Sequence, residues 1–151
     1  MNFPFETITD SPALTESLGK ELADILQSNP ALPRFIAMYG DLGVGKTAFV
    51  RGFCSDICSG ATVKSPTFAL VNEYKCNGSV REKKVYHFDM YRISGEDDLY
   101  SIGFYDYLDN GCFCIVEWSE LIPFALPESY VRVLIEKLDS ESKRSIKISL
   151  E

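Results

Sequence analysis

The feature that most constrains the fold is a short glycine-rich stretch that ends in a lysine and a threonine. It consists of Gly40, Asp41, Leu42, Gly43, Val44, Gly45, Lys46 and Thr47. The glycines in this G-x-x-x-x-G-K-T spacing let the backbone curl, so that its N–H groups point toward phosphate oxygens. Lys46 can reach the terminal phosphates, and the Thr47 hydroxyl can bind magnesium. The stretch therefore predicts a site for a nucleoside triphosphate and Mg²⁺.

Such a loop is informative only when a strand precedes it and a helix follows it, and the flanking residues predict both. The segment Arg34–Tyr39 is short and mostly apolar, as expected of a buried strand. After the loop, apolar residues recur at helical spacing as far as about Cys58. The phosphates would then lie at a helix N-terminus, where free N–H groups and the helix dipole favour anions.

The remaining hydrophobic pattern predicts six further strands, at 5–8, 68–74, 84–91, 112–116, 130–138 and 145–150. The run at 112–116 is apolar throughout, which is typical of a strand covered on both faces in a parallel sheet. Asn77-Gly78 indicates a turn, so the strands on either side of it should form a hairpin. The predicted fold class is α/β, a single P-loop-type ATPase domain over 1–151. We expect a mixed β-sheet flanked by helices, with antiparallel hairpins.

Two further helices have recognisable first residues. Ser11 can cap a helix that begins at Pro12, whose apolar face would be formed by Leu14, Leu18, Leu22, Ile25 and Leu26. Ser94 begins the second through an approximate capping box, in which Asp97 takes the place of the usual glutamate or glutamine.

A loop of this kind needs a carboxylate near the magnesium ion, at the C-terminal end of a neighbouring strand. Glu117 follows the most apolar run of the chain and is the favoured candidate, tied to the metal through water. Asp89 follows a more mixed run and would be a second site carboxylate, on the metal shell or orienting the attacking water. The alternatives are a solvated acid for Glu117 and an ion-paired hairpin residue for Asp89.

Three more residues have two interpretations each. Trp118, the only tryptophan, could stack on a base or a partner, or pack against the preceding helix. His87, the only histidine, is either structural or a hydrogen-bonding group near the site. The Thr67 hydroxyl could sense the γ-phosphate or bind magnesium, or Thr67 could belong to a turn before a strand.

Charge and composition narrow the classes of function. The net charge of −7 argues against a strong direct contact with nucleic acid, although a role on RNA through a partner stays open. No apolar run approaches the ~18 residues of a membrane span, and the N-terminus lacks the pattern of a signal peptide. The five cysteines, an odd number, are expected to be reduced thiols. We therefore expect a cytoplasmic protein without membrane contact.

Four stretches taken together resemble the TsaE family, the bacterial ATPase of tRNA threonylcarbamoyladenosine biosynthesis. They are Gly40–Thr47, Val63–Tyr74, His87–Arg92 and Val116–Glu120, in the order and spacing of that family. The resemblance spans roughly residues 10–150, nearly the whole chain.

The resemblance implies binding of ATP or ADP with Mg²⁺ and weak hydrolysis by the chain alone. It implies partners of the TsaD and TsaB type, which perform the transfer to the adenosine beside the anticodon, so that tRNA is reached only indirectly. In such proteins the residues matching Thr47 and Glu117 lie at the magnesium ion. The residues matching Asp89 and Thr67 are needed around the γ-phosphate. A late basic residue near the nucleotide corresponds to Arg144, and residues near Ser11 border the base.

The leading hypothesis from the sequence is an ATPase that drives or resets a tRNA-modifying assembly. Lys46, magnesium and the loop amides would stabilise charge on the phosphates. The sequence contains no convincing internal arginine finger, for which Arg92 and Arg144 are the candidates, and a missing finger would explain slow turnover and dependence on a partner. The alternatives are a small-molecule or nucleotide kinase and a non-enzymatic adaptor that is switched by nucleotide binding.

Overall fold

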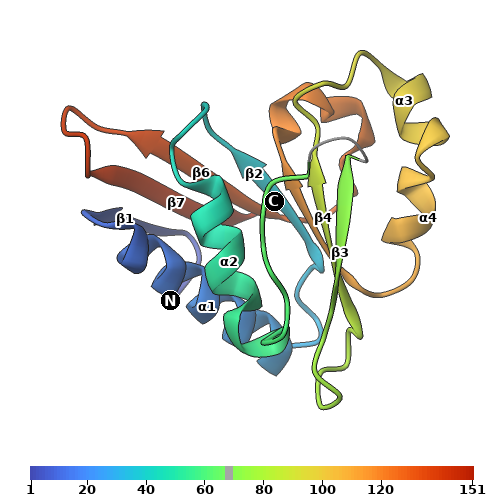
Figure 1. Cartoon of the computed structure of the whole chain (residues 1–151), viewed down its shortest axis with the longest axis horizontal. Coiled ribbons are helices and arrows are strands. Elements are labelled where there is room, and N and C mark those ends of the chain that lie inside the picture. Colours follow the sequence, from blue (N-terminus) through green and yellow to red (C-terminus); the bar gives the residue numbers. More distant parts are fainter. Residues whose placement is uncertain (67–69) are drawn as a thin grey trace.

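A computed structural model describes residues 1–66 and 70–151, which form one seven-stranded mixed sheet with helices on both faces (Figure 1). The sheet has the order β1-β7-β6-β2-β5-β4-β3. Its strands are β1 (Phe5–Thr9), β2 (Phe35–Tyr39), β3 (Val71–Lys75), β4 (Lys84–Asp89), β5 (Phe113–Glu117), β6 (Val131–Lys137) and β7 (Arg144–Leu150). The helices are α1 (Pro12–Ser28), α2 (Lys46–Ile57), α3 (Glu96–Ser101) and α4 (Phe104–Leu108), with 3-10 turns η1 (Ser119–Leu121) and η2 (Pro123–Ala125).

The centre of the sheet is parallel. Strand β2 lies between β5 and β6 and pairs with both in parallel, and β5 also pairs in parallel with β4. All five residues of β5 are buried, which confirms the central position predicted from its continuous apolar run. Because these strands run in the same direction, their carboxyl ends meet at one edge of the sheet, where the loop after β2 begins.

Antiparallel strands complete the sheet on both sides. The hairpin of β3 and β4 was predicted and is confirmed, as is the terminal hairpin of β6 and β7. Strand β1 pairs only with β7 and forms one edge, as predicted for the segment 5–8.

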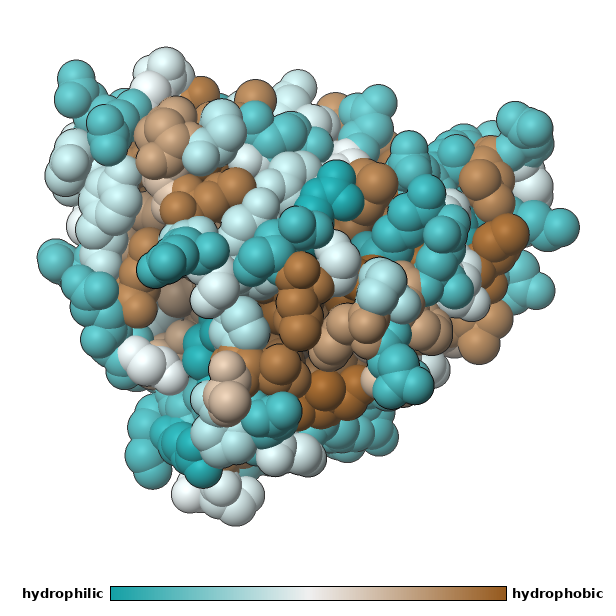
Figure 2. Space-filling model, turned by 180° about the vertical axis from the view of Figure 1, so that it is seen from behind, coloured by the Kyte–Doolittle hydropathy of each residue, from teal (hydrophilic) through white to brown (hydrophobic). Residues whose placement is uncertain are grey.

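The helices form two layers, and the side chains of β2 alternate between them. Ile36 and Met38 belong to the apolar cluster under α1 and α2. Phe35 and Ala37 point the other way, into the cluster with α3, α4 and η2. Because successive side chains of a strand point to opposite faces, β2 contributes apolar side chains to the clusters on both faces of the sheet. The face opposite to that seen in Figure 1 mixes hydrophobic and hydrophilic residues (Figure 2).

The start of α1 agrees with the prediction, but part of its apolar face does not. The Ser11 hydroxyl accepts from the Leu14 N–H at 3.2 Å and Pro12 is the first helical residue. Leu14, however, is 46% exposed, and the buried positions of the helix include the small residue Gly19 instead. The reason is that α1 meets α2 at close range, along a line where glycine fits and leucine does not.

The predicted capping box of α3 is wrong by one position. Asp98, not Asp97, reaches back to Ser94, accepting from both its N–H and its hydroxyl at 2.9 and 2.8 Å. The helix begins at Glu96, so Gly95 is its N-cap, and Asp98 is the third helical residue that a capping box uses. Strand β3 begins at Val71, later than predicted, and Thr67 lies outside the described residues.

The described helices differ from membrane-spanning helices in length and composition. None of them is both long enough and apolar enough for a transmembrane span.

Gly19 and Gly52 allow the close approach of α1 and α2. The contact at Gly52 yields a prediction for the stability of the fold. A Cβ at position 52 would lie 1.8 Å from the Glu16 carbonyl oxygen, in backbone that cannot move away. We expect Gly52→Ala to lower the free energy of unfolding by about 1–3 kcal/mol, measured by urea denaturation. Gly60→Ala is the matched control, because no atom lies within 4 Å of its added Cβ. Equal stabilities of the two variants would contradict this explanation of the helix contact.

Candidate functional site

The glycine-rich loop connects β2 to α2, and several of its amide groups have no acceptor among the described residues. Gly40, Gly43 and Gly45 have φ angles of 142°, 73° and 109°, in a region that side chains with a Cβ rarely adopt. Gly45 is the N-cap of α2 and provides no side-chain cap. In the described part of the chain, no acceptor takes the N–H groups of Gly43, Val44 or Gly45. These donors lie at the N-terminus of α2, a position that can bind an anion.

The loop is anchored by contacts with distant parts of the chain. A Cβ at Gly40 would lie 2.4 Å from the Ile135 carbonyl oxygen, so the backbone passes close against β6. The Gly40 N–H donates to Glu120 at 3.3 Å, and Arg144 Nε donates to the Val44 carbonyl at 3.0 Å. The loop is therefore held from β6, β7 and η1.

Lys46 is buried at the base of the loop, with only 5% of its surface exposed. Its ammonium donates to the Gly40 carbonyl and lies 3.7 Å from the centre of the Trp118 ring. Desolvation lowers the pKa of Lys46, although the nearby carboxylates of Glu117, Glu120, Asp89 and Asp41 oppose the shift. A phosphate would supply the close negative charge that this ammonium lacks.

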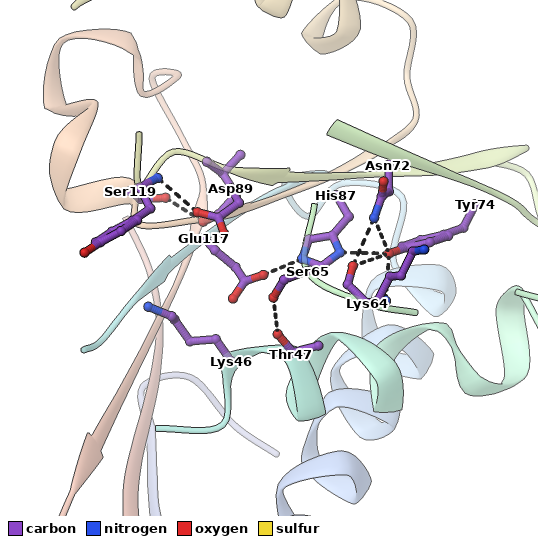
Figure 3. Close-up of polar contacts among 12 residues, drawn as sticks. Lys46, Thr47, Lys64, Ser65, Asn72, Tyr74, His87, Asp89, Glu117 and Ser119 are labelled. Carbon is purple, nitrogen blue, oxygen red and sulfur yellow. Dashed lines mark hydrogen bonds and ion pairs between the residues drawn. The ribbon is translucent and has the colours of Figure 1, made fainter. Parts of the chain in front are cut away.

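One pocket of about 220 Å³ brings together most of the residues proposed from the sequence. Its lining includes Lys46, Thr47, Asp89, Glu117 and Trp118. Asp89 and Glu117 are directly paired in the parallel register of β4 and β5, so both carboxylates leave the sheet at the same level (Figure 3).

A buried histidine makes a short contact with the Glu117 carboxylate. The Glu117 carboxylate is almost fully buried, and its Oε2 lies 2.6 Å from His87 Nε2 (Figure 3). His87 is itself fully buried, and its Nδ1 lies 2.9 Å from the Tyr74 hydroxyl. The two interpretations of His87 therefore hold together: it is a core residue, and it makes hydrogen bonds next to the site.

The surroundings of the Asp89 carboxylate are unfavourable for a negative charge. Its Oδ1 accepts from the Tyr91 N–H at 2.9 Å. Desolvation raises the pKa of Asp89, the Tyr91 N–H opposes the shift, and the neighbouring charge of Glu117 adds to it. The environment therefore favours proton uptake by Asp89 more than a solvated position would.

Ser65 is a residue of the site that the sequence did not single out. Its hydroxyl lies 2.7 Å from that of Thr47, and it lines the same pocket. The only signal was indirect: Ser65 lies two residues before Thr67, whose hydroxyl was a candidate to sense the γ-phosphate. The γ-phosphate role of Thr67 stays a prediction, because Thr67 lies outside the described residues.

Of the other predicted residues, Leu42 also lines the main pocket, whereas Ser11 and Arg144 do not. Ser11 and Arg144 line a second pocket of about 90 Å³ beyond Val44, away from Lys46. Asp41 accepts from the Leu42 N–H at 2.8 Å, and the Leu42 side chain is exposed. Trp118 packs on Tyr91, with ring centres 5.0 Å apart, and it lies against the apolar cluster that also contains Phe104 of the preceding helix α4.

The groups in the main pocket fit a nucleotide phosphate with magnesium. The loop contributes N–H donors and one ammonium, which match phosphate oxygens. Thr47 contributes a hydroxyl, and Asp89 and Glu117 contribute carboxylates, which are the oxygen ligands that magnesium prefers. Magnesium usually keeps several waters and takes few protein ligands, so phosphate oxygens and water would complete its shell.

Comparison with known proteins places these features in one family. The model of the family described as "Threonylcarbamoyl adenosine biosynthesis protein TsaE" matches residues 9–146. A protein of that name from Haemophilus influenzae is 38% identical over 80% of this chain and 75% of its own length. The Bacillus subtilis protein is 32% identical over 89% and 79%, and the Rickettsia bellii protein 33% over 91% and 90%. The crystal structure of Bacillus subtilis YdiB is also similar, with a TM-score of 0.70 and 27% identity over the whole of this chain and 88% of that one.

The environment of Asp89 yields a prediction on stability and pH. A raised pKa in the folded protein means that the carboxylate destabilises the fold above that pKa, and that this cost vanishes below the pKa of the unfolded chain. Asp89→Asn should therefore raise the melting temperature at pH 7.5, and the gain should disappear as the pH falls below about 4. Asp139→Asn changes the net charge equally at an exposed turn and should have no such effect. A stabilisation by Asp89→Asn that persists at low pH would contradict this account.

Proposed function

Because this chain belongs to the TsaE family of threonylcarbamoyladenosine biosynthesis proteins, we propose that it binds ATP or ADP with magnesium and hydrolyses ATP slowly. The nucleotide would lie over the glycine-rich loop, with its phosphates at the N-terminus of α2. The hydrolysis would serve the formation of threonylcarbamoyladenosine in tRNA.

One observation carries this proposal. Loop amides that have no acceptor within residues 1–66 and 70–151 lie beside a pocket whose lining combines Lys46, Thr47, Asp89 and Glu117. A loop that only made a structural turn would not need a buried ammonium and two buried or half-buried carboxylates beside it, because burying charge is costly. The combination is instead suited to the transfer of a phosphoryl group to water.

Each residue of the pocket would have a separate role in binding or hydrolysis. The loop amides and Lys46 would bind phosphate oxygens, with Lys46 exchanging its contact with the Gly40 carbonyl for one with phosphate. Thr47 and Glu117 would hold the magnesium, Glu117 through water, and Asp89 would orient the attacking water. Bound magnesium would neutralise charge on the phosphate oxygens. Ser11 and Arg144 would border the nucleotide from the second pocket.

The charges around the pocket support a need for partners. Arg144 is engaged with the carbonyls of Val44, Glu141 and Lys143, on the far side of the loop from Thr47. Arg92 lines a small cavity beside Asp89, but it is exposed. Neither guanidinium is fixed over the main pocket, which supports slow hydrolysis by the chain alone and stimulation by another protein. We propose partners of the TsaD and TsaB type, which would carry out the transfer and contact the tRNA.

Nucleotide binding can be tested with Lys46→Met, which keeps the length of the side chain but removes its charge. We expect at least a tenfold loss of affinity for Mg·ATP, measured through the fluorescence of Trp118, the only tryptophan, and confirmed by calorimetry. Lys147→Met is the control, since Lys147 pairs with Glu6 at the other edge of the sheet. Unchanged affinity in Lys46→Met would refute the assignment of the loop.

The role in tRNA modification can be tested by reconstitution with the partner proteins. Formation of threonylcarbamoyladenosine should require this chain and ATP over repeated turnovers, and Lys46→Met should fail to support it. Phosphate release should accompany modification. Full modification without phosphate release would instead favour a nucleotide-switched adaptor.

A further inference from the structure

A continuous series of polar contacts runs from the proposed magnesium site to the segment that carries Ser65. It begins at Glu117 Oε2, continues through Nε2 and Nδ1 of His87 to the Tyr74 hydroxyl, and ends at the Lys64 carbonyl, 3.1 Å from that hydroxyl (Figure 3). His87 is fully buried, and Tyr74 and Glu117 are 6% and 3% exposed. Water therefore has little access to this series of contacts, and its polar groups depend on one another.

The available donors and acceptors fix the direction of the hydrogen bond between His87 and Glu117. An ionised carboxylate only accepts, so His87 Nε2 must donate to it. If the ring is neutral, Nδ1 then accepts the Tyr74 hydroxyl proton, and the Lys64 carbonyl is served by Asn72 Nδ2 at 3.0 Å. If Tyr74 donates to the Lys64 carbonyl instead, Nδ1 must donate to Tyr74 and the ring is cationic. In both arrangements, the imidazole pins one oxygen of Glu117 and leaves the other for the pocket.

The same tyrosine also fixes the opposite wall of the pocket. The Lys64 backbone contacts the Tyr74 hydroxyl through both its N–H, at 3.4 Å, and its carbonyl. The next residue, Ser65, lies against the Thr47 hydroxyl. The Glu117 carboxylate and the Ser65 hydroxyl line the same pocket as Thr47, and the positions of both depend on contacts that lead back to Tyr74.

We propose that His87 and Tyr74 are positioning residues for the magnesium site: His87 aims the Glu117 carboxylate, and Tyr74 fixes His87 and the Lys64–Ser65 backbone. The inference rests on the proposed function, since it assigns these residues to the magnesium ion that the function requires. Groups behind a metal ligand typically change metal affinity or activity about 10–100-fold when they are removed.

The test compares two amides that replace opposite sides of the imidazole. The His87→Asn amide corresponds to Nδ1 and can meet Tyr74 but not Glu117, whereas the longer His87→Gln amide corresponds to Nε2 and can still donate to Glu117. Tyr74→Phe removes only the shared hydroxyl. Tyr86→Phe is its control, because that hydroxyl meets Asn110 on the other face of the sheet. The readout is the affinity for ADP in excess Mg²⁺ and in EDTA, with thermal unfolding of each variant.

We expect His87→Asn to reduce the magnesium-dependent gain in ADP affinity about 10–100-fold, with His87→Gln close to wild type and Tyr74→Phe in between. Affinity in EDTA should change little. In a Glu117→Gln background the effect of His87→Asn should disappear, because it acts through that carboxylate. If His87→Asn does not fold, the pair Tyr74→Phe and Tyr86→Phe decides the question in the same way.

Two results would overturn the inference while leaving the proposed function intact. One is an equal loss in His87→Asn and His87→Gln, and the other is a loss that persists in the Glu117→Gln background, since both indicate a purely structural role. Equal magnesium dependence of Tyr74→Phe and wild type would overturn the part assigned to Tyr74. Absence of magnesium-dependent ADP binding in the wild-type chain would instead refute the proposed function, and the inference with it.

Discussion

The parallel pairing of β2, β5 and β4 is the constraint on which the site depends. It places the end of β2, where the glycine-rich loop begins, beside the ends of the two strands that carry Glu117 and Asp89. Had β4 and β5 been antiparallel neighbours, one of these carboxylates would lie at the far end of the sheet. The buried apolar runs that stabilise the sheet therefore also determine where the charged groups meet.

The site costs stability, and the structure offsets only part of that cost. Desolvation lowers the pKa of Lys46 and raises that of Asp89, so both charges are less favourable here than in water. Glu117 is better satisfied, since His87 contacts it within the core. A bound phosphate would place negative charge next to Lys46, and a magnesium ion held by Thr47 and Glu117 would place positive charge near Asp89, so that ligand binding would offset both costs.

The backbone of the glycine-rich loop is anchored by protein contacts on one side and presents amide donors on the other. Contacts with Ile135, Glu120 and Arg144 fix its outer backbone, whereas the amides of Gly43, Val44 and Gly45 have no acceptor among the described residues. A preorganised set of donors binds phosphate without paying for its own ordering at that moment. With a net charge of −7, the surface as a whole does not favour nucleic acid, which agrees with a protein that reaches tRNA through partners.

The sequence by itself determined the features that depend on neighbouring residues: the loop, the strand before it and the helix after it, the central strand β5, both hairpins and the strand-end position of Glu117. These follow from local sterics and from periods of two and 3.6 residues. Only the tertiary structure decided the contacts between distant segments, such as Arg144 with Val44, Ser65 with Thr47, and His87 with Glu117. It also decided that Leu14 is exposed, because the close approach of α1 to α2 at Gly19 and Gly52 sets the buried face. Such contacts depend on how whole elements pack, and no local pattern records that.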